Sequence, residues 1–184
     1  MKPKIGLLIL DRDGVILKHK DPYILQVKDI EFIPGSKKSI KHIAARGIPI
    51  AVVTNQSPIR RGLITAQFVK KTHVWIQNAV ALNRNQIKFY YCPHRLEDRC
   101  NCRKPQIGML KRACDDFKVN PSNCWMLGDH DSDMQAAKNM SINKRIHLLS
   151  GRQATPSRFA TEIKADLSIF TYKYFTKGVL YDHN

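Results

Sequence analysis

The sequence predicts an α/β fold, a doubly wound parallel sheet with helices on both faces. Apolar runs of strand length alternate with helical patterns, and most of these runs are apolar throughout, as in strands buried on both faces. Polar residues follow several of the runs directly. The chain has 184 residues, the length of one domain. We therefore expect one domain over residues 1–184, with no segment long enough for a large cap.

The first half of the chain supplies three strands and two helices. A helix is expected from Pro34-Gly35-Ser36 to about Arg46, with Ser36 as its cap and Gly47 as its stop signal. The other elements are strands at Lys4–Leu10, Ile48–Val53 and Ile87–Tyr91, and a helix at Thr65–Leu82.

In the second half, Pro105 suits a first helical position and predicts a helix through Phe117. The elements that follow are strands at Cys124–Leu127 and Arg145–Leu149, a helix at Asp131–Met140, and a candidate sixth strand at Asp166–Phe170. This order is that of a Rossmann-like sheet with right-handed crossovers, whose ligand site lies at the carboxyl ends of the strands. From about Tyr172 the chain is mixed in character, and we expect a poorly fixed tail.

The composition is that of an ordinary globular protein, with 43% hydrophobic and 25% charged residues. No apolar run approaches the roughly 20 residues needed to span a bilayer. The apolar stretch Ile5–Leu10 is too short for a signal-peptide core, so we expect a cytoplasmic protein without a membrane partner.

The net charge is +16, with 31 Lys and Arg against 15 Asp and Glu, which favours an anionic ligand. The basic residues are spread in pairs along the chain, without the aromatic interleaving of a nucleic-acid surface. We expect a small phosphorylated ligand and a monomer, with nucleic acid disfavoured.

Two carboxylates, Asp11 and Asp13, stand where the first buried strand ends. Extended backbone tends to aim residues two apart to the same side, and Gly14 permits a sharp turn afterwards. Close carboxylates repel, and a hard divalent cation such as magnesium relieves the repulsion. Taken alone, the pair also fits an ordinary polar strand end.

Three further polar segments follow in the chain. Thr54-Asn55-Gln56-Ser57 offers a hydroxyl and free amides for phosphate oxygens, or forms an ordinary turn. Arg103-Lys104-Pro105 sets two cations beside a predicted helix start. Gly128-Asp129-His130-Asp131-Ser132-Asp133 follows a later strand, where Asp129 can complete a metal site with Asp11 and either Asp131 or Ser132 can cap a helix.

The loop 92–102 contains four metal-binding side chains within eleven residues: Cys92, His94, Cys100 and Cys102. Three thiolates and an imidazole form a closed tetrahedral zinc site, which is structural when all four ligands come from protein. The loop leads directly into Arg103 and Lys104, so we expect zinc to hold these cations in place. The remaining Cys114 and Cys124 stand in apolar surroundings and are interpreted as small buried hydrophobes.

The four polar segments that contain Asp11, Thr54, Lys104 and Asp129 occur in this order, each at the end of a predicted strand. In this they resemble the haloacid dehalogenase-like phosphohydrolases, and the resemblance extends over nearly the whole chain. The resemblance implies a magnesium-dependent phosphatase with Asp11 as nucleophile and Asp13 as general acid and then base. Thr54 and Lys104 would bind the transferring phosphoryl group. Magnesium would be held by Asp11, the backbone carbonyl of Asp13, and Asp129.

The zinc loop and Thr54-Asn55-Gln56-Ser57-Pro58-Ile59-Arg60-Arg61-Gly62 resemble the branch that acts on a heptose bisphosphate or on histidinol phosphate. The heptose reading is preferred, and implies a role in lipopolysaccharide synthesis. Tyr23 would flank the substrate, with further contacts from Asn55, Gln56, Ser57, Arg61 and Arg103. Arg103 would recognise the distal part of the substrate, and Arg61 a second phosphate.

Three residues depart from the heptose pattern: Leu17, expected near the substrate, Pro58 and His130. The alternatives are a histidinol-phosphate phosphatase, a nucleic-acid 3′-phosphatase, and a zinc-bearing binding module without catalysis.

Overall fold

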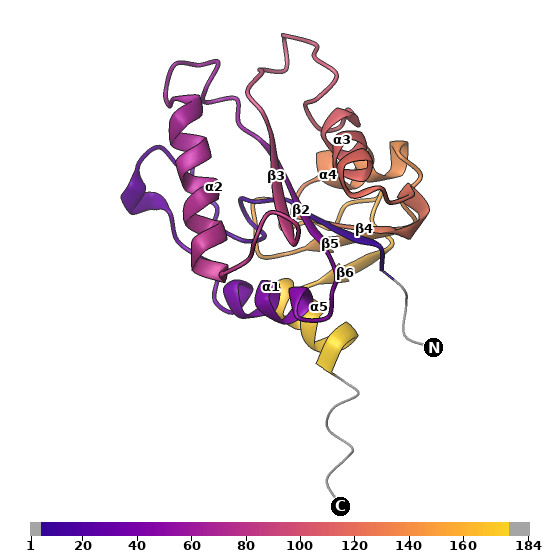
Figure 1. The fold of residues 1–184 in the computed structure, drawn as a ribbon. Helices are drawn as coiled ribbons and strands as arrows, with labels where there is room; N and C mark the ends of the chain where they lie inside the picture. Colours follow the sequence, from indigo (N-terminus) through magenta and orange to yellow (C-terminus); the bar gives the residue numbers. More distant parts are fainter. Residues whose placement is uncertain (1–4, 177–184) are drawn as a thin grey trace, which may run out of the picture.

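The computed structural model describes residues 5–176, and its centre is a sheet of six parallel strands in the order β3-β2-β1-β4-β5-β6 (Figure 1). The strands are β1 (Leu7–Leu10), β2 (Ile50–Asn55), β3 (Ile87–Cys92), β4 (Cys124–Gly128), β5 (Lys144–Leu148) and β6 (Glu162–Lys164). The predicted doubly wound parallel sheet is confirmed.

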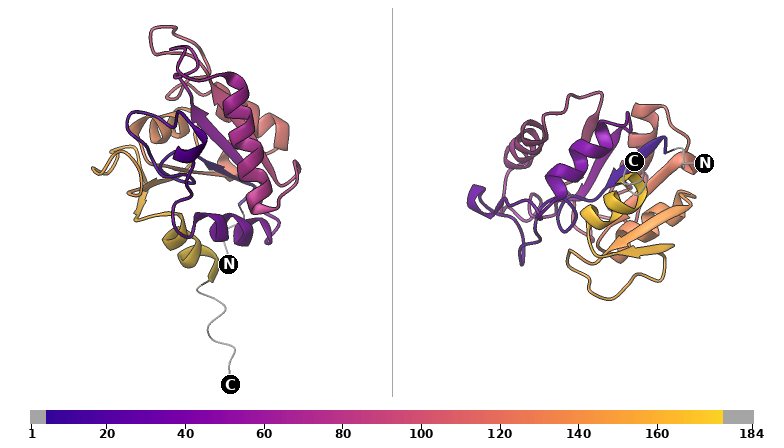
Figure 2. Two further views of the ribbon diagram at one scale, coloured as in Figure 1. Left: turned by 90° about the vertical axis from the view of Figure 1, so that its left-hand side faces the viewer. Right: turned by 90° about the horizontal axis from the view of Figure 1, so that it is seen from below.

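Helices cover both faces of this sheet. Residues of α1 (Ser36–Ala44), α2 (Ala66–Val80) and α5 (Leu167–Thr171) pack into one apolar cluster, and those of α3 (Gly108–Phe117) and α4 (Asp131–Asn139) into the other. Strand β1 alternates between them, with Leu8 and Leu10 in the first cluster and Leu7 and Ile9 in the second. In Figures 1 and 2, α1 and α5 lie side by side.

Three short helical turns complete the described elements. They are η1 (Val27–Asp29), η2 (Pro121–Asn123) and the π-helical η3 (Tyr172–Thr176). In η3, Tyr174 and Phe175 pack against the first apolar cluster. The rest of the predicted tail lies outside the described residues.

The strand order places the ends of β1, β2 and β4 next to one another. Leu10 is paired with Val52 on one side and Leu127 on the other, and the Asp11 amide donates to the Leu127 carbonyl at 2.9 Å. The chain winds outward from β1 to β3 and then crosses to β4, so β1 lies at the switch point where such folds bind ligands.

The predicted sixth strand at Asp166–Phe170 is wrong. Asp166 caps helix α5 instead, because its carboxylate accepts hydrogen bonds from the amides of Ser168 and Ile169, at 2.8 and 2.9 Å. The sixth strand is β6, three residues long at the edge of the sheet.

Several predicted element ends also need correction. Gly35, with a φ of 80°, is the N-cap of α1, and the Ser36 hydroxyl donates instead to the Ile16 carbonyl at 2.9 Å. Helix α3 begins at Gly108, so Pro105 lies in the preceding loop. The described part of the first strand begins at Leu7, and Lys4 lies outside the described residues.

Within residues 5–176, no helix combines the length and the apolar character that crossing a membrane requires.

Candidate active site and metal-binding loop

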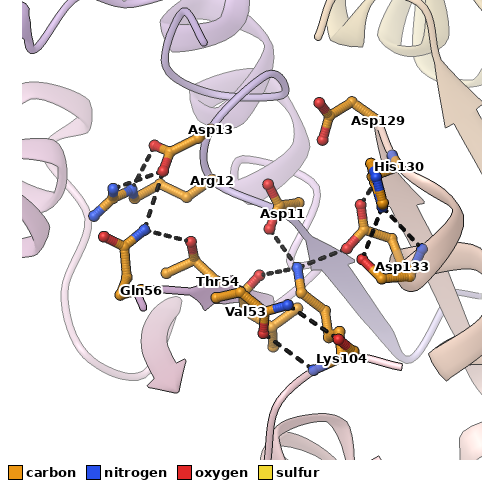
Figure 3. A network of polar contacts seen from close by, with 12 residues as sticks. Asp11, Arg12, Asp13, Val53, Thr54, Gln56, Lys104, Asp129, His130 and Asp133 are labelled. Carbon is orange, nitrogen blue, oxygen red and sulfur yellow. Dashed lines mark hydrogen bonds and ion pairs between the residues drawn. The ribbon is translucent and has the colours of Figure 1, made fainter. Parts of the chain in front are cut away.

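Lys104 joins residues that lie on or after three different strands, β1, β2 and β4 (Figure 3). Its ammonium contacts the Asp11 carboxylate, donates to the Val53 carbonyl at 2.8 Å and pairs with Asp133 at 2.7 Å. The residue is only 3% exposed. Burial opposes its charge, but Asp11 and Asp133 outweigh this effect and raise the pKa of Lys104, which stays protonated.

Three buried carboxylates lie close to one another beside this lysine, and two of them, Asp11 and Asp133, pair with it. Oxygen atoms of Asp11, Asp129 and Asp133 all lie within 4.8 Å of one another. Burial, reinforced by repulsion from the other two acids, raises the pKa of Asp11 well above its ordinary value. The same two effects, burial first and then Asp133, raise the pKa of Asp129 to about 7.

Burial and mutual repulsion destabilise the ionised forms of these three carboxylates. Oxygen ligands in such an arrangement fit a hard divalent cation. Both carboxylate oxygens of Asp133 already have partners: one pairs with Lys104, and the other accepts from the His130 amide at 3.1 Å. Asp11 and Asp129 are therefore the more available side-chain ligands.

Asp13 is held by a second, separate network. The Arg12 guanidinium donates from Nε and Nη2 to the two oxygens of the Asp13 carboxylate, at 2.8 and 2.7 Å, and Arg12 is itself only 2% exposed. The Gln56 amide donates to Asp13 at 3.0 Å and to the Thr54 hydroxyl at 2.9 Å. Burial works against ionisation, but Arg12 and Gln56 prevail and lower the pKa of Asp13.

Asn55 fixes the backbone of Lys104. Its side-chain oxygen accepts from the Lys104 amide at 3.0 Å, and its side-chain nitrogen donates to the Lys104 carbonyl at 3.1 Å. The end of β2 thereby sets the position of a lysine that belongs to the loop between β3 and α3.

The Asp129 side chain lies in a narrow slot between two glycines. A methyl group added at Gly14 would come within 2.3 Å of the Asp129 carboxylate, and one added at Gly151 within 2.0 Å. The Arg152 amide donates to this carboxylate at 2.7 Å. Only residues without a side chain allow the loops after β1 and β5 to approach Asp129 so closely.

These groups line one pocket at the carboxyl ends of the strands. Of the predicted site residues, the pocket is lined by Asp11, Asp13, Tyr23, Thr54, Asn55, Ser57, Arg103, Lys104 and Asp129. Gln56 lies behind it, bonded to Asp13 and Thr54, and Arg61 is not among the lining residues. Leu17, expected near the substrate, is instead fully buried in the first apolar cluster.

The start of α4 differs from the prediction that Asp131 or Ser132 caps it. The N-cap is His130, whose Nδ1 accepts from the Ser132 amide at 3.2 Å, while Asp133 accepts from the His130 amide. His130 and Ser132 both line the pocket. The reciprocal capping keeps Asp133 turned toward Lys104.

The loop after β3 brings together the four predicted zinc ligands. The sulfurs of Cys92, Cys100 and Cys102 lie 3.2 to 3.6 Å apart, and His94 Nδ1 lies 3.3 Å from Cys102 and 3.6 Å from Cys92. Ligands about 2.3 Å from a tetrahedral zinc ion would be separated by about 3.8 Å, so the cluster is suited to such an ion.

This loop is coupled to the cations that follow it. The Arg103 amide donates to the Cys100 sulfur at 3.4 Å, and the Arg103 guanidinium to the His94 carbonyl at 3.2 Å. Burial opposes ionisation of Cys100, but the Arg103 amide and neighbouring donors lower the pKa of its thiol to about 7. The free thiols Cys114 and Cys124 are both buried, as predicted.

Sequence reasoning missed three residues of the site: Arg12, Asp133 and Arg152. Arg12 stands between the two predicted acids, and this position was the only sequence signal for its role. Asp133 lies four residues beyond Asp129, on the first turn of α4. Arg152 follows β5, and its place after a strand was the signal that could have revealed it.

Comparison with known proteins gives concordant results. Residues 5–141 match the family model of the haloacid dehalogenase-like hydrolases. A D-glycero-beta-D-manno-heptose-1,7-bisphosphate 7-phosphatase of Pseudomonas aeruginosa is 38% identical over 134 residues, covering 72% of this chain and 75% of that protein. A Campylobacter jejuni relative, named for the alpha anomer, is 37% identical over 144 residues, covering 78% and 82%.

A crystal structure of a D,D-heptose 1.7-bisphosphate phosphatase from B. bronchiseptica, complexed with magnesium and phosphate, superposes with a TM-score of 0.82. It is 26% identical and covers 94% of this chain and 97% of that one. The fold, the order of the site segments and these similarities agree, and the chain belongs to the haloacid dehalogenase-like hydrolases.

Proposed function

We propose that this protein is a magnesium-dependent phosphatase that removes the 7-phosphate of D-glycero-D-manno-heptose 1,7-bisphosphate through an aspartyl-phosphate on Asp11. The observation that carries the proposal is the convergence of Asp11, Lys104 and Asp129 in one pocket, each from a loop that follows a different strand. The named heptose bisphosphate phosphatases among the relatives support the substrate.

The first step forms a bond from an Asp11 oxygen to phosphorus and breaks the bond from phosphorus to the sugar oxygen. Lys104 lies against Asp11 and neutralises the charge of the nucleophile and the phosphoryl oxygens. The Thr54 hydroxyl and the backbone after β2 offer hydrogen bonds to the same oxygens.

Asp13 is the proton carrier in this scheme. It gives a proton to the departing sugar oxygen and then takes one from the water that hydrolyses the aspartyl-phosphate. Its pairing with Arg12 and lowered pKa suit the second, base-catalysed step. For the first step the carboxyl turns from Arg12 toward the pocket that it already lines.

Magnesium would be held by Asp11 and Asp129 together with the backbone carbonyl of Asp13. When bound, it supplies positive charge that neutralises phosphoryl oxygens and relieves the repulsion between the carboxylates. Zinc would be held by Cys92, His94, Cys100 and Cys102 and would fix the loop that carries Arg103 and Lys104.

The relatives include enzymes named for each anomer of the heptose, so the similarity supports the sugar and does not choose the anomer. Tyr23, Ser57 and Arg103 line the pocket, which supports the proposal that they contact the sugar. We propose further that the enzyme is cytoplasmic, a single domain and a monomer.

Phosphate release from purified protein with magnesium tests the proposal. The substrates are both anomers of the heptose bisphosphate, histidinol phosphate, and an oligonucleotide with a 3′-phosphate. We expect kcat/KM to be highest for a heptose bisphosphate. Preference for histidinol phosphate or the oligonucleotide would overturn the substrate assignment, and no release from any of them would overturn the function.

Replacing the nucleophile tests the mechanism. Asp11→Asn removes one of three crowded acids while keeping the shape of the side chain, so thermal stability should be retained or raised. Turnover should fall by about 10³-fold or more, because the nucleophile is lost. An active Asp11→Asn protein would exclude the aspartyl-phosphate.

A further inference from the structure

The loop Ser150–Gln153, which follows β5, is tied to the catalytic edge on both sides of Arg152. Before it, the Ser150 hydroxyl donates to the Gly14 carbonyl at 2.8 Å. After it, the Gln153 side chain accepts from the Asp131 amide at 3.0 Å and donates to the Asp131 carboxylate at 3.2 Å. The Arg152 amide itself donates to Asp129, so the backbone here is fixed from three sides.

The Arg152 side chain is exposed and lines the pocket. Within residues 5–176, its guanidinium makes no hydrogen bond and no ion pair, while its backbone is anchored. The other pocket cations next to the acids are already engaged: Lys104 by Asp11 and Asp133, and the Arg103 guanidinium by the His94 carbonyl. Arg152 is therefore a free fork-shaped cation on a fixed backbone.

The pocket lining holds more cations than the acids engage. A metal and the transferring phosphoryl group would lie at the acids and Lys104, and Lys20, from the loop after β1, and Arg152 add two further cations to the lining. These two cations favour a molecule that carries a second anionic group besides the phosphoryl group that is transferred.

We propose that Arg152 is a specificity-determining residue that binds the second, non-transferred phosphate of a sugar bisphosphate. The inference rests on the proposed function and deepens it. A guanidinium matches two phosphate oxygens at once, which a flexible lysine does not. The proposal gives Arg152 the role that the sequence suggested for Arg61, because Arg61 is not among the residues that line the pocket.

The test compares D-glycero-D-manno-heptose 1,7-bisphosphate with the same sugar carrying the 7-phosphate alone. In Arg152→Met, kcat/KM for the bisphosphate should fall roughly 10- to 100-fold, mainly through KM, because a charge-assisted contact is lost. The preference of the enzyme for the bisphosphate over the monophosphate should shrink by the same factor. Arg152→Lys should restore part of it.

Two further variants make the test specific. Arg84→Met removes an exposed arginine at the amino end of β3, away from the pocket, and controls for loss of surface charge. Arg61→Met tests the competing assignment.

An unchanged bisphosphate preference in Arg152→Met, an equal loss on both substrates, or a loss found in Arg61→Met instead would each overturn the inference. Failure of the wild-type enzyme to hydrolyse the bisphosphate would instead overturn the proposed function.

Discussion

The placement of Lys104 should depend on Asn55, although Asn55 belongs to a different strand. The Asn55 amide makes two hydrogen bonds to the Lys104 backbone, at 3.0 and 3.1 Å, and Lys104 is almost fully buried. Asn55→Ala leaves both backbone groups without these partners. At about 0.5 to 1.5 kcal/mol each, the two bonds are together worth about 1 to 3 kcal/mol.

If most of that free energy is lost from the transition state, kcat/KM falls about 5- to 150-fold. The fold should survive, because the ammonium of Lys104 keeps its contacts with Asp11, Asp133 and the Val53 carbonyl. Asn55→Asp keeps the acceptor for the Lys104 amide but sets a carboxylate oxygen against the Lys104 carbonyl. It should therefore be at least as impaired as Asn55→Ala.

The assay is steady-state phosphate release with magnesium, accompanied by thermal unfolding, and exposed Asn85→Ala serves as the control. A double-mutant cycle tests whether Asn55 acts through Lys104. In a Lys104→Met background, Asn55→Ala should cause little further loss of activity. Full wild-type activity in Asn55→Ala, or losses that simply multiply in the double variant, would refute the reasoning.

Three other predictions follow from the site. Without divalent cations, Asp129 has a pKa of about 7 in the folded protein, against about 3.9 when unfolded, so the folded state binds the extra proton. Its contribution to the free energy of unfolding should therefore fall by about 1.4 kcal/mol per pH unit between about pH 4 and 7. The free energy of unfolding is measured by urea titration in the presence of a chelator, at a series of pH values, for the wild type and for Asp129→Asn. An equal dependence of this free energy on pH in both proteins would contradict the raised pKa of Asp129. Removing zinc with a zinc-selective chelator, magnesium being in excess, should lower the melting temperature and phosphatase activity together. Zinc and not magnesium should restore both, and activity that persists in zinc-free protein would refute the role of the loop. Arg12→Met should slow hydrolysis of the aspartyl-phosphate, because Arg12 keeps Asp13 in the ionised form that acts as the base in this step. Every substrate passes through this intermediate, so its breakdown, followed in rapid-quench experiments, should slow equally with the sugar phosphate and with p-nitrophenyl phosphate. An unchanged rate of breakdown would show that Arg12 does not serve Asp13.

The sheet could be predicted because its central strands are unambiguous. Runs such as Leu7–Leu10 and Cys124–Gly128 are buried on both faces, and a continuous apolar run of that length is a strong strand signal. The edge strand Glu162–Lys164 is polar and short, so it carries no such signal. Asp166–Phe170 looked like a strand because the capping role of Asp166 was not recognised.

The site could be predicted only as a set of segments. Strand ends indicated Asp11, Thr54 and Asp129, since parallel strands bring their carboxyl ends to one edge. The partners of these residues depend on loop conformation, which spacing alone does not fix. The Arg12–Asp13 pair between adjacent residues and the Asn55–Lys104 link across 49 positions are of this kind.

The strand order also bears on how the chain folds during synthesis. Strands β1, β2 and β3 pair in the order in which they leave the ribosome, but the second neighbour of β1 is β4, which begins at Cys124. Until that segment emerges, one side of β1 offers unpaired backbone groups next to a largely apolar half-sheet. Nascent chains arrested before Cys124 should therefore be the species that chaperones bind and that aggregate most readily.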